Sequence, residues 1–229
     1  MAATVTRVFD RIYLDTKARV VDLARGLTEE QLAAVVAGTP AWTGRDVVAH
    51  LVGVASDIVN GRLENAPMPE WTEPQVSSRR GRSLDELVAE WDEAAPAVAT
   101  RLAERTVSLP TVFDALTHEA DLREAFGVGR PPERDVDAVA RALAKGVVGH
   151  FAGPGTLVVR TGDAEWSGGH GEPRFELDVE PYELFRGLLS RRSRKQMRGW
   201  RWAGAGDPDE LIEKLPVFGA RDDDQPVPV

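Results

Sequence analysis

Two histidines and two aspartates in this sequence have the types and the spacing that metal chemistry needs. In FDALTHEADLREAFG, residues 113–127, Asp114, His118 and Asp121 follow one another at steps of four and three. On a helix these steps place the three side chains on one narrow stripe. His50 lies in the apolar stripe of another expected helix, where an imidazole without a partner would carry a desolvation cost. We therefore expect His50 to have a polar partner.

These side chains form a donor set that suits a divalent cation. Asp114 and His118, one helical turn apart, can point at one place between two helices, and His50 would add a second imidazole. Two imidazoles and one carboxylate suit zinc and leave a fourth position open for water or substrate. Asp121, one turn further, is better placed to accept a hydrogen bond from His118 and to orient it. The simpler interpretation, a hydrogen-bonded core histidine beside a solvated acidic face, stays open at this point.

Several other classes of site and partner are excluded. HEADL fails as the zinc-protease motif HExxH because Leu122 stands where the second histidine would be. The chain contains no cysteine, so it can form no disulfide, thiolate metal site or cysteine nucleophile, and any thiol must come from outside. A net charge of -9 repels phosphate backbones, so we expect no nucleic-acid partner.

The distribution of apolar residues indicates where the protein resides. No apolar run approaches the roughly 18 residues that a membrane span needs, so we expect no membrane association. The first residues, MAATVTRVFDRIYLD, acquire acidic side chains at once and have no apolar stretch followed by a cleavage site, so they do not resemble a secretory signal. We expect a cytoplasmic protein.

Helical patterns must position the candidate ligands. Thr43 with Asp46, and Ser83 with Glu86, form the pattern of capped helix starts, and apolar residues recur at steps of three and four after each. Five helices are predicted over residues 4–25, 43–58, 83–105, 109–127 and 135–151. Long helices joined by short connections favour a bundle, and facing helices can build a metal site inside it.

The residue composition and pattern of the sequence change after residue 152. Short β-rich runs broken by Gly and Asp predict strands within residues 153–180, because such breaks are typical of tight turns. A helix over 181–200, a short strand at 200–203 and a last helix over 208–218 follow. We therefore predict an α+β protein, with a helical bundle over residues 1–152, a small mixed α/β domain over 153–220 and a disordered tail over 221–229.

Four stretches form a series of motifs that covers nearly the whole chain: WTGRDVVAHLVGVASDIVNGR, DALTHEADLREAFG, LFRGLLSRRSR and GDPDELIEKLPVFG. In content and order they resemble the mycothiol-dependent maleylpyruvate isomerase family of actinobacteria. The resemblance implies a DinB-like antiparallel four-helix bundle followed by a sterol-carrier-like domain. It also implies a divalent metal, zinc by preference, held by His50, Asp114 and His118. The family usually has glutamate at the position of Asp114, so the site depends on the reach of a carboxylate one methylene shorter.

The same resemblance implies a class of reaction. Family members use the metal to hold the thiol of mycothiol, which adds to an unsaturated diacid and allows cis–trans isomerisation. We therefore expect an isomerase or thiol transferase that acts on a small electrophile, with mycothiol as the low-molecular-weight thiol. The alternative is a non-catalytic protein that binds a small ligand and has a degraded metal site. The resemblance does not determine the substrate or the oligomeric state.

Two further groups of residues invite a functional interpretation. A basic segment lies within residues 186–201, and Arg191 or Arg192 could bind a substrate carboxylate in bidentate fashion. For most of this segment a solvated surface is the simpler interpretation. The tryptophans are expected to be packing residues, except Trp71, whose loop over residues 66–82 could form a lid.

Overall fold

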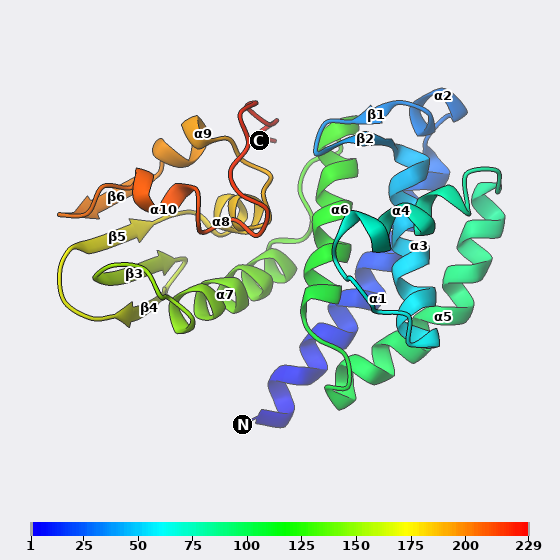
Figure 1. Ribbon diagram of the computed structural model, residues 1–229. Helices are drawn as coiled ribbons and strands as arrows, with labels where there is room; N and C mark the ends of the chain where they lie inside the picture. The colour runs from blue at the N-terminus through cyan, green and yellow to red at the C-terminus, as the bar shows by residue number, and fades with distance from the viewer. Residues whose placement is uncertain (1, 229) are drawn as a thin grey trace. The chain divides into compact units, whose positions relative to one another are not determined.

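The fold is described by a computed structural model that covers residues 2–228, with side chains from residue 8 onward. The contacts divide the chain into two units, with the division between Gly129 and Arg130. The first unit is helical apart from one hairpin, and the second combines helices with a sheet (Figure 1). The predicted α+β class is therefore confirmed.

The first unit is a bundle of four long helices, α1, α3, α5 and α6. They span Ala2–Gly26, Gly44–Asn60, Leu84–Glu104 and Pro110–Phe126. Helix α1 packs against α5 and α6, and α3 packs against the same two helices, so the four form a closed ring. The side chain of Thr43 caps α3 and that of Ser83 caps α5, as predicted. Gly61 and Gly127 end α3 and α6 with left-handed φ values of 70° and 66°, which glycine adopts without strain.

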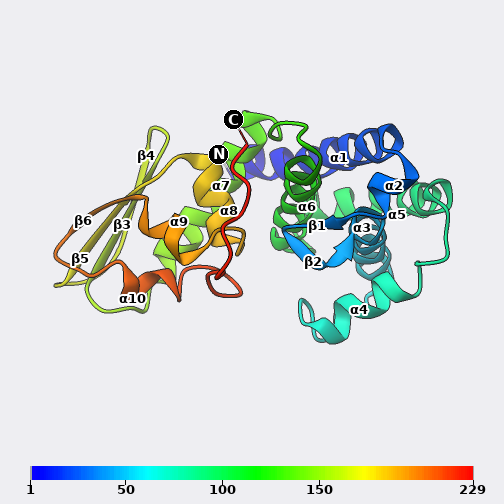
Figure 2. The same ribbon diagram turned by 90° about the horizontal axis from the view of Figure 1, so that it is seen from above.

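Shorter elements fill the connections of the bundle. Between α1 and α3 lie α2 (Glu29–Leu32) and a hairpin made of β1 (Val35–Val36) and β2 (Thr39–Thr43). This hairpin, which the sequence patterns did not predict, lies over one end of α3 and α6 (Figures 1 and 2). The loop expected over residues 66–82 contains helix α4, Pro69–Ser77, which packs against α3. In this loop the indole nitrogen of Trp71 donates to the carbonyl oxygen of Arg62 at 2.7 Å.

The second unit is built around a mixed sheet. Its elements are α7 (Glu133–Gly149), β3 (Thr156–Thr161), β4 (Ala164–Gly169), β5 (Arg174–Asp178), α8 (Pro181–Leu188), α9 (Arg194–Arg198), β6 (Arg201–Gly204) and α10 (Asp209–Ile212). Among the described residues the sheet has the strand order β4-β3-β5-β6. Strands β3 and β5 are parallel, and the two outer pairs are antiparallel. Helix α7 packs along β3 and β4 and against α8 (Figure 1).

Several boundaries differ from those that composition predicts. The contacts place α7 in the second unit, whereas the change in residue composition suggested a division at residue 152. The helix predicted over 181–200 is two helices, because Ser190 between them has a left-handed φ of 61°. In the predicted tail, Gln225 is buried and its backbone nitrogen donates to Gln196 at 3.0 Å. Within residues 2–228, no helix combines the length and the apolar character needed to cross a bilayer.

Candidate metal centre

Helices α3 and α6 bring one carboxylate and two imidazoles together inside the bundle. Nε2 of His50 lies 3.4 Å from Oδ2 of Asp114, and Nε2 of His118 lies 3.4 Å from Oδ1 of the same carboxylate. One donor atom from each of the three residues lies within 4.8 Å of the other two. Asp114 and His118 are neighbours because four residues make about one helical turn. The predicted stripe on α6 therefore faces His50.

The environment of His118 fixes the orientation of its ring. Nδ1 of His118 lies 3.0 Å from Oδ2 of Asp121, three residues along the same helix. Both side chains are buried, so the hydrogen bond between them has little competition from water. A proton on Nδ1 donates to Asp121 and leaves the lone pair of Nε2 directed at the cluster, which is the arrangement of a metal-binding histidine. Asp121 thus lies within hydrogen-bond distance of His118, on the side of the ring opposite Nε2.

The spacing of the three donors fits a small cation. Two ligand atoms that each lie about 2.0–2.1 Å from one ion in tetrahedral geometry are separated by about 3.3 Å. The two separations of 3.4 Å between Asp114 and the imidazoles are close to that value. A charge-assisted hydrogen bond between imidazolium and carboxylate would be shorter, at about 2.7–2.9 Å. These two separations therefore match those of two ligand atoms on one ion, and they are longer than those of a close charge-assisted hydrogen bond.

Two buried polar atoms in the cluster support the same conclusion. Among the described residues, Nδ1 of His50 and Oδ2 of Asp114 have no hydrogen-bond partner. Buried polar atoms are seldom left without one, and a bound cation would satisfy the carboxylate oxygen. The side chain of Asp114 keeps 34% of its surface exposed, whereas His50 keeps 3% and His118 keeps 5%. The side chain of Asp114 is therefore partly exposed although its Oδ2 atom is buried, and both imidazoles are enclosed.

The electrostatics of the cluster favour an ionised carboxylate. Burial alone would raise the pKa of Asp114, but the neighbouring His50 and His118 outweigh it and hold that pKa well below its ordinary value. Burial alone would lower the pKa of His118, but Asp114 and Asp121 outweigh it and raise that pKa above its ordinary value. Asp114 is therefore negatively charged at neutral pH, as a metal ligand must be.

An aromatic side chain that the sequence patterns did not place at the site packs against the two imidazoles. The ring centroid of Trp42, in β2, lies 4.7 Å from that of His50 and 5.8 Å from that of His118. Trp42 precedes the capping residue Thr43, and an apolar residue at that position commonly packs against the first turns of its helix. This signal could have placed Trp42 near His50, although only a general packing role is expected for Trp42 from the sequence.

The arginines singled out in the sequence lie in the second unit. Arg192 is fully buried, and its guanidinium donates to the carboxylate of Glu183 at 2.7 Å and 2.9 Å. Arg191 is half-buried and donates to the carbonyl oxygen of Leu189 at 2.9 Å. The bidentate face of Arg192, which could hold a substrate carboxylate, is thus directed at Glu183.

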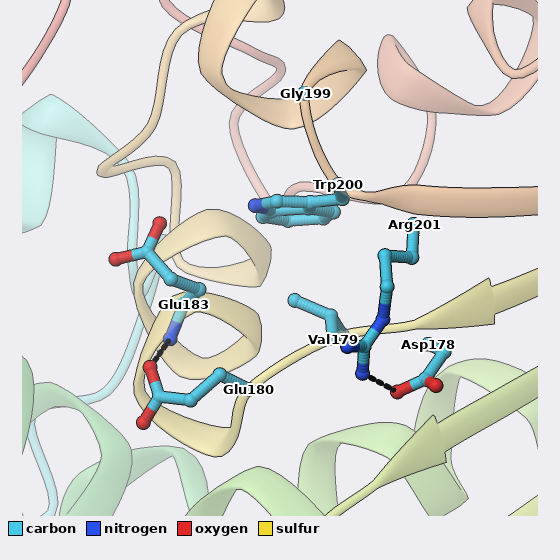
Figure 3. A pocket seen from close by; sticks show the side chains of 7 residues that line it. All are labelled: Asp178, Val179, Glu180, Glu183, Gly199, Trp200 and Arg201. Atoms are coloured by element: carbon cyan, nitrogen blue, oxygen red, sulfur yellow. Dashed lines mark hydrogen bonds and ion pairs between the residues drawn. The ribbon is translucent and has the colours of Figure 1, made fainter.

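The second unit also contains an open cavity of about 230 Å³ beneath the indole of Trp200 (Figure 3). Its charged lining groups already have partners. Asp178 bonds to Arg201 at 2.7 Å, Glu180 accepts from Arg130 at 3.2 Å and Glu183 accepts from Arg192. Each of these three carboxylates is therefore already paired with an arginine and is not available to bind a ligand in the cavity.

Comparison with known proteins relates the metal centre to a family. The model of the mycothiol maleylpyruvate isomerase N-terminal domain matches residues 13–150, which include the whole cluster and helix α7. The chain belongs to this family. The mycothiol maleylpyruvate isomerase domain therefore ends about where composition changes, some 20 residues beyond the contact-based division of the chain.

Solved structures agree with the fold of the mycothiol maleylpyruvate isomerase family. The crystal structure of the mycothiol-dependent maleylpyruvate isomerase is similar at 14% identity and a TM-score of 0.52, over 90% of this chain and 95% of that one. A histidine-to-alanine mutant of that enzyme matches with the same values. At this identity the similarity concerns the fold alone. No curated protein matches the chain in sequence.

Proposed function

We propose that the protein is a divalent-metal-dependent enzyme that uses mycothiol to isomerise, or to transfer a thiol to, a small electrophile that carries a carboxylate. His50, Asp114 and His118 would hold the ion, with zinc the preferred metal for two imidazoles and one carboxylate. Membership of the mycothiol maleylpyruvate isomerase family supports the thiol and the reaction class.

The observation that carries this proposal is the position of Asp114 between two imidazoles. Its carboxylate lies 3.4 Å from Nε2 on each side, so a side chain one methylene shorter than glutamate reaches both histidines. A degraded site, the alternative considered from the sequence, would leave the carboxylate out of reach of at least one imidazole. The spacing therefore favours the enzyme over a non-catalytic binding protein.

The residues of the site have separate roles in this proposal. The two imidazoles and Asp114 bind the ion and fix its position, and Asp121 keeps His118 in the tautomer that presents Nε2. A bound divalent ion would supply Lewis acidity and keep a coordinated thiol deprotonated at neutral pH. The enclosed imidazoles and the partly exposed Asp114 leave the approach to the carboxylate side of the cluster.

A basic side chain for the substrate carboxylate is a further part of the proposal. Arg191 is the better candidate of the two arginines, because the guanidinium of Arg192 is enclosed and directed at Glu183. If Arg191 binds the substrate, Arg191→Ala should raise KM for a dicarboxylate substrate and leave the metal content unchanged. A normal KM would remove Arg191 from the proposal without affecting the metal site.

The test of the proposed function combines binding with turnover. Protein loaded with cobalt(II) should develop a near-ultraviolet charge-transfer absorption when mycothiol is added, and His118→Ala should not. With mycothiol and a cis-unsaturated diacid, the zinc-loaded protein should form the trans isomer, detected by chromatography. Failure of mycothiol to change the spectrum or to support turnover would contradict a thiol-dependent function.

A further inference from the structure

We propose that the β1–β2 hairpin positions the metal-binding histidines, through Trp42 on the two imidazole rings and through Gly38 on the carboxylate of Asp121. The inference rests on the proposed function, because it assigns positioning residues to the same metal site. It concerns a segment that lies outside the helices carrying the ligands.

Trp42 restrains the ring of His50, whose Nδ1 atom has no hydrogen bond like the one that orients His118. The ring of His118 is oriented by its hydrogen bond to Asp121, but Nδ1 of His50 has no hydrogen-bond partner among the described residues. The orientation of His50 therefore depends on packing together with the contact of its Nε2 atom with Asp114 at 3.4 Å. The indole of Trp42 lies over this ring with centroids 4.7 Å apart and planes tilted by 36°.

The same indole also contacts the second imidazole. Its centroid lies 5.8 Å from that of His118, and the two imidazoles are 4.9 Å apart with their planes at 77°. The three rings of Trp42, His50 and His118 thus form one packed group. Rotation of His50 away from the ion would have to displace the indole, so Trp42 holds Nε2 of His50 toward Asp114.

Gly38, in the turn of the hairpin, acts on His118 through Asp121. Gly38 is buried, and a Cβ atom at this position would lie 2.4 Å from Oδ1 and 2.7 Å from Cγ of Asp121. Both distances are shorter than side-chain atoms tolerate, and Asp121 is itself buried. A side chain at position 38 would therefore push Asp121 away from Nδ1 of His118.

The hairpin is fixed to the helix that carries His50. Val36 is fully buried, and the backbone nitrogen of Gly44 donates to the carbonyl oxygen of Ala34 at 3.0 Å. The side chain of Thr43, directly after Trp42, caps α3. These anchors make the hairpin a rigid support, which is what the surroundings of a metal ligand need.

The first test measures the dissociation constant of zinc by competition with a chromophoric chelator. Trp42→Ala should weaken binding about 10- to 100-fold, the range typical of residues that orient metal ligands. Trp42→Phe keeps an aromatic ring and should restore most of the affinity. Trp71→Phe is the matched control in the same unit, because Trp71 bonds to Arg62 and has no ring contact with either histidine. Its zinc affinity should equal that of wild type.

The second test asks whether Gly38 acts through Asp121. Gly38→Ala should weaken zinc binding about 10- to 100-fold, but it should have little further effect in an Asp121→Ala background, where the displaced carboxylate is absent. Gly26→Ala is the matched control, because a Cβ atom there meets no other atom within 4 Å. Equal weakening by Gly38→Ala in both backgrounds would overturn the assigned role of Gly38.

The outcomes separate the inference from the proposed function. If wild type binds zinc and folded Trp42→Ala binds it equally well, the positioning role of Trp42 is overturned while the metal site stands. If wild type binds no zinc, the proposed function fails and the inference fails with it. Circular dichroism establishes that each variant is folded. If Trp42→Ala does not fold, Trp42→Leu takes its place, and wild-type affinity in that variant would equally overturn the role of Trp42.

Discussion

Asp114 is the residue on which the chemistry of the cluster depends. It lies 3.4 Å from Nε2 of His50 and 3.4 Å from Nε2 of His118, so it contacts both potential ligands at once. Its charge also sets the protonation of His118, whose raised pKa reflects this carboxylate more than Asp121. Removing one negative charge should therefore change both metal binding and the pH dependence of stability.

Substitution of Asp114 tests its role as a ligand. Asp114→Asn keeps the shape of the side chain but removes the anionic donor, so we expect zinc affinity to fall by more than the roughly 100-fold limit for residues that only orient ligands. Asp114→Glu restores the carboxylate and should retain most of the affinity. Isothermal titration with zinc measures both. Wild-type affinity in Asp114→Asn would show that the aspartate is not a ligand.

The pH dependence of the metal-free protein follows from His118. Because its pKa is raised in the folded state, protonated His118 stabilises the fold fully below its unfolded pKa of about 6.5, and this contribution is lost as pH rises through the folded value. The free energy of unfolding of metal-free protein should therefore fall as pH increases above about 6.5. Urea denaturation at a series of pH values measures it, and Asp114→Asn should weaken the trend.

Added zinc should reverse that trend. Metal binding requires neutral imidazoles, so the stabilisation by a fixed excess of zinc should grow with pH over the same range. A metal-free protein whose stability rises with pH above about 6.5, or a zinc effect that shrinks with pH, would contradict the electrostatic account of the cluster.

Among the elements, the helices that carry the metal ligands were predictable from the sequence. How these helices face one another, and how the hairpin packs on them, was not predictable from local patterns. The caps at Thr43 and Ser83 and the stripe of Asp114 and His118 are local patterns, readable from a few neighbouring residues. Which way α6 faces, and that Trp42 folds back over His50, depend on contacts between segments distant in the sequence. Local periodicity contains no information about such contacts.

The packing of α4 on α3 gives a prediction at this scale. A Cβ atom at Gly53 would lie 2.4 Å from Cβ of Gln75, and Gln75 is itself fixed by donating to Asp57 at 2.7 Å. Gly53→Ala should therefore overpack this contact and lower the free energy of unfolding by about 1–3 kcal/mol. In Gly146→Ala, inside α7, the new Cβ meets nothing within 4 Å. That control should gain about 0.5–1 kcal/mol. Equal changes in the free energy of unfolding of Gly53→Ala and Gly146→Ala, measured by chemical denaturation, would contradict close packing at Gly53.

At the scale of the whole molecule, the chain joins two units with different chemistry. The first contains the candidate metal centre, and the second contains the ion pair of buried Arg192 with partly buried Glu183. Composition predicted a division at residue 152, close to the end of the family match at residue 150, whereas the contacts divide the chain after Gly129. An amphipathic helix has one apolar face wherever it packs, so its sequence does not reveal whether a bundle or a sheet covers that face.

The ion pair of Arg192 and Glu183 in the second unit should contribute to the stability of the fold rather than to metal binding. Arg192→Ala would leave Glu183, whose side chain is 18% exposed, without its buried partner, which costs about 3–5 kcal/mol of unfolding free energy. Arg201→Ala breaks an exposed pair with Asp178 and should cost at most about 1 kcal/mol. Chemical denaturation compares the two variants. A loss of bound zinc from native Arg192→Ala would contradict the separation of roles.

The claim that His50, Asp114 and His118 bind a metal ion is tested by the metal content of the purified protein. Wild type and His118→Ala are purified in parallel without chelator or affinity-tag metal, and bound metals are quantified by inductively coupled plasma mass spectrometry. We expect close to one divalent ion per chain in wild type, zinc in preference to others, and loss of this ion in His118→Ala. Wild type that carries no metal and does not take up added zinc would contradict the claim.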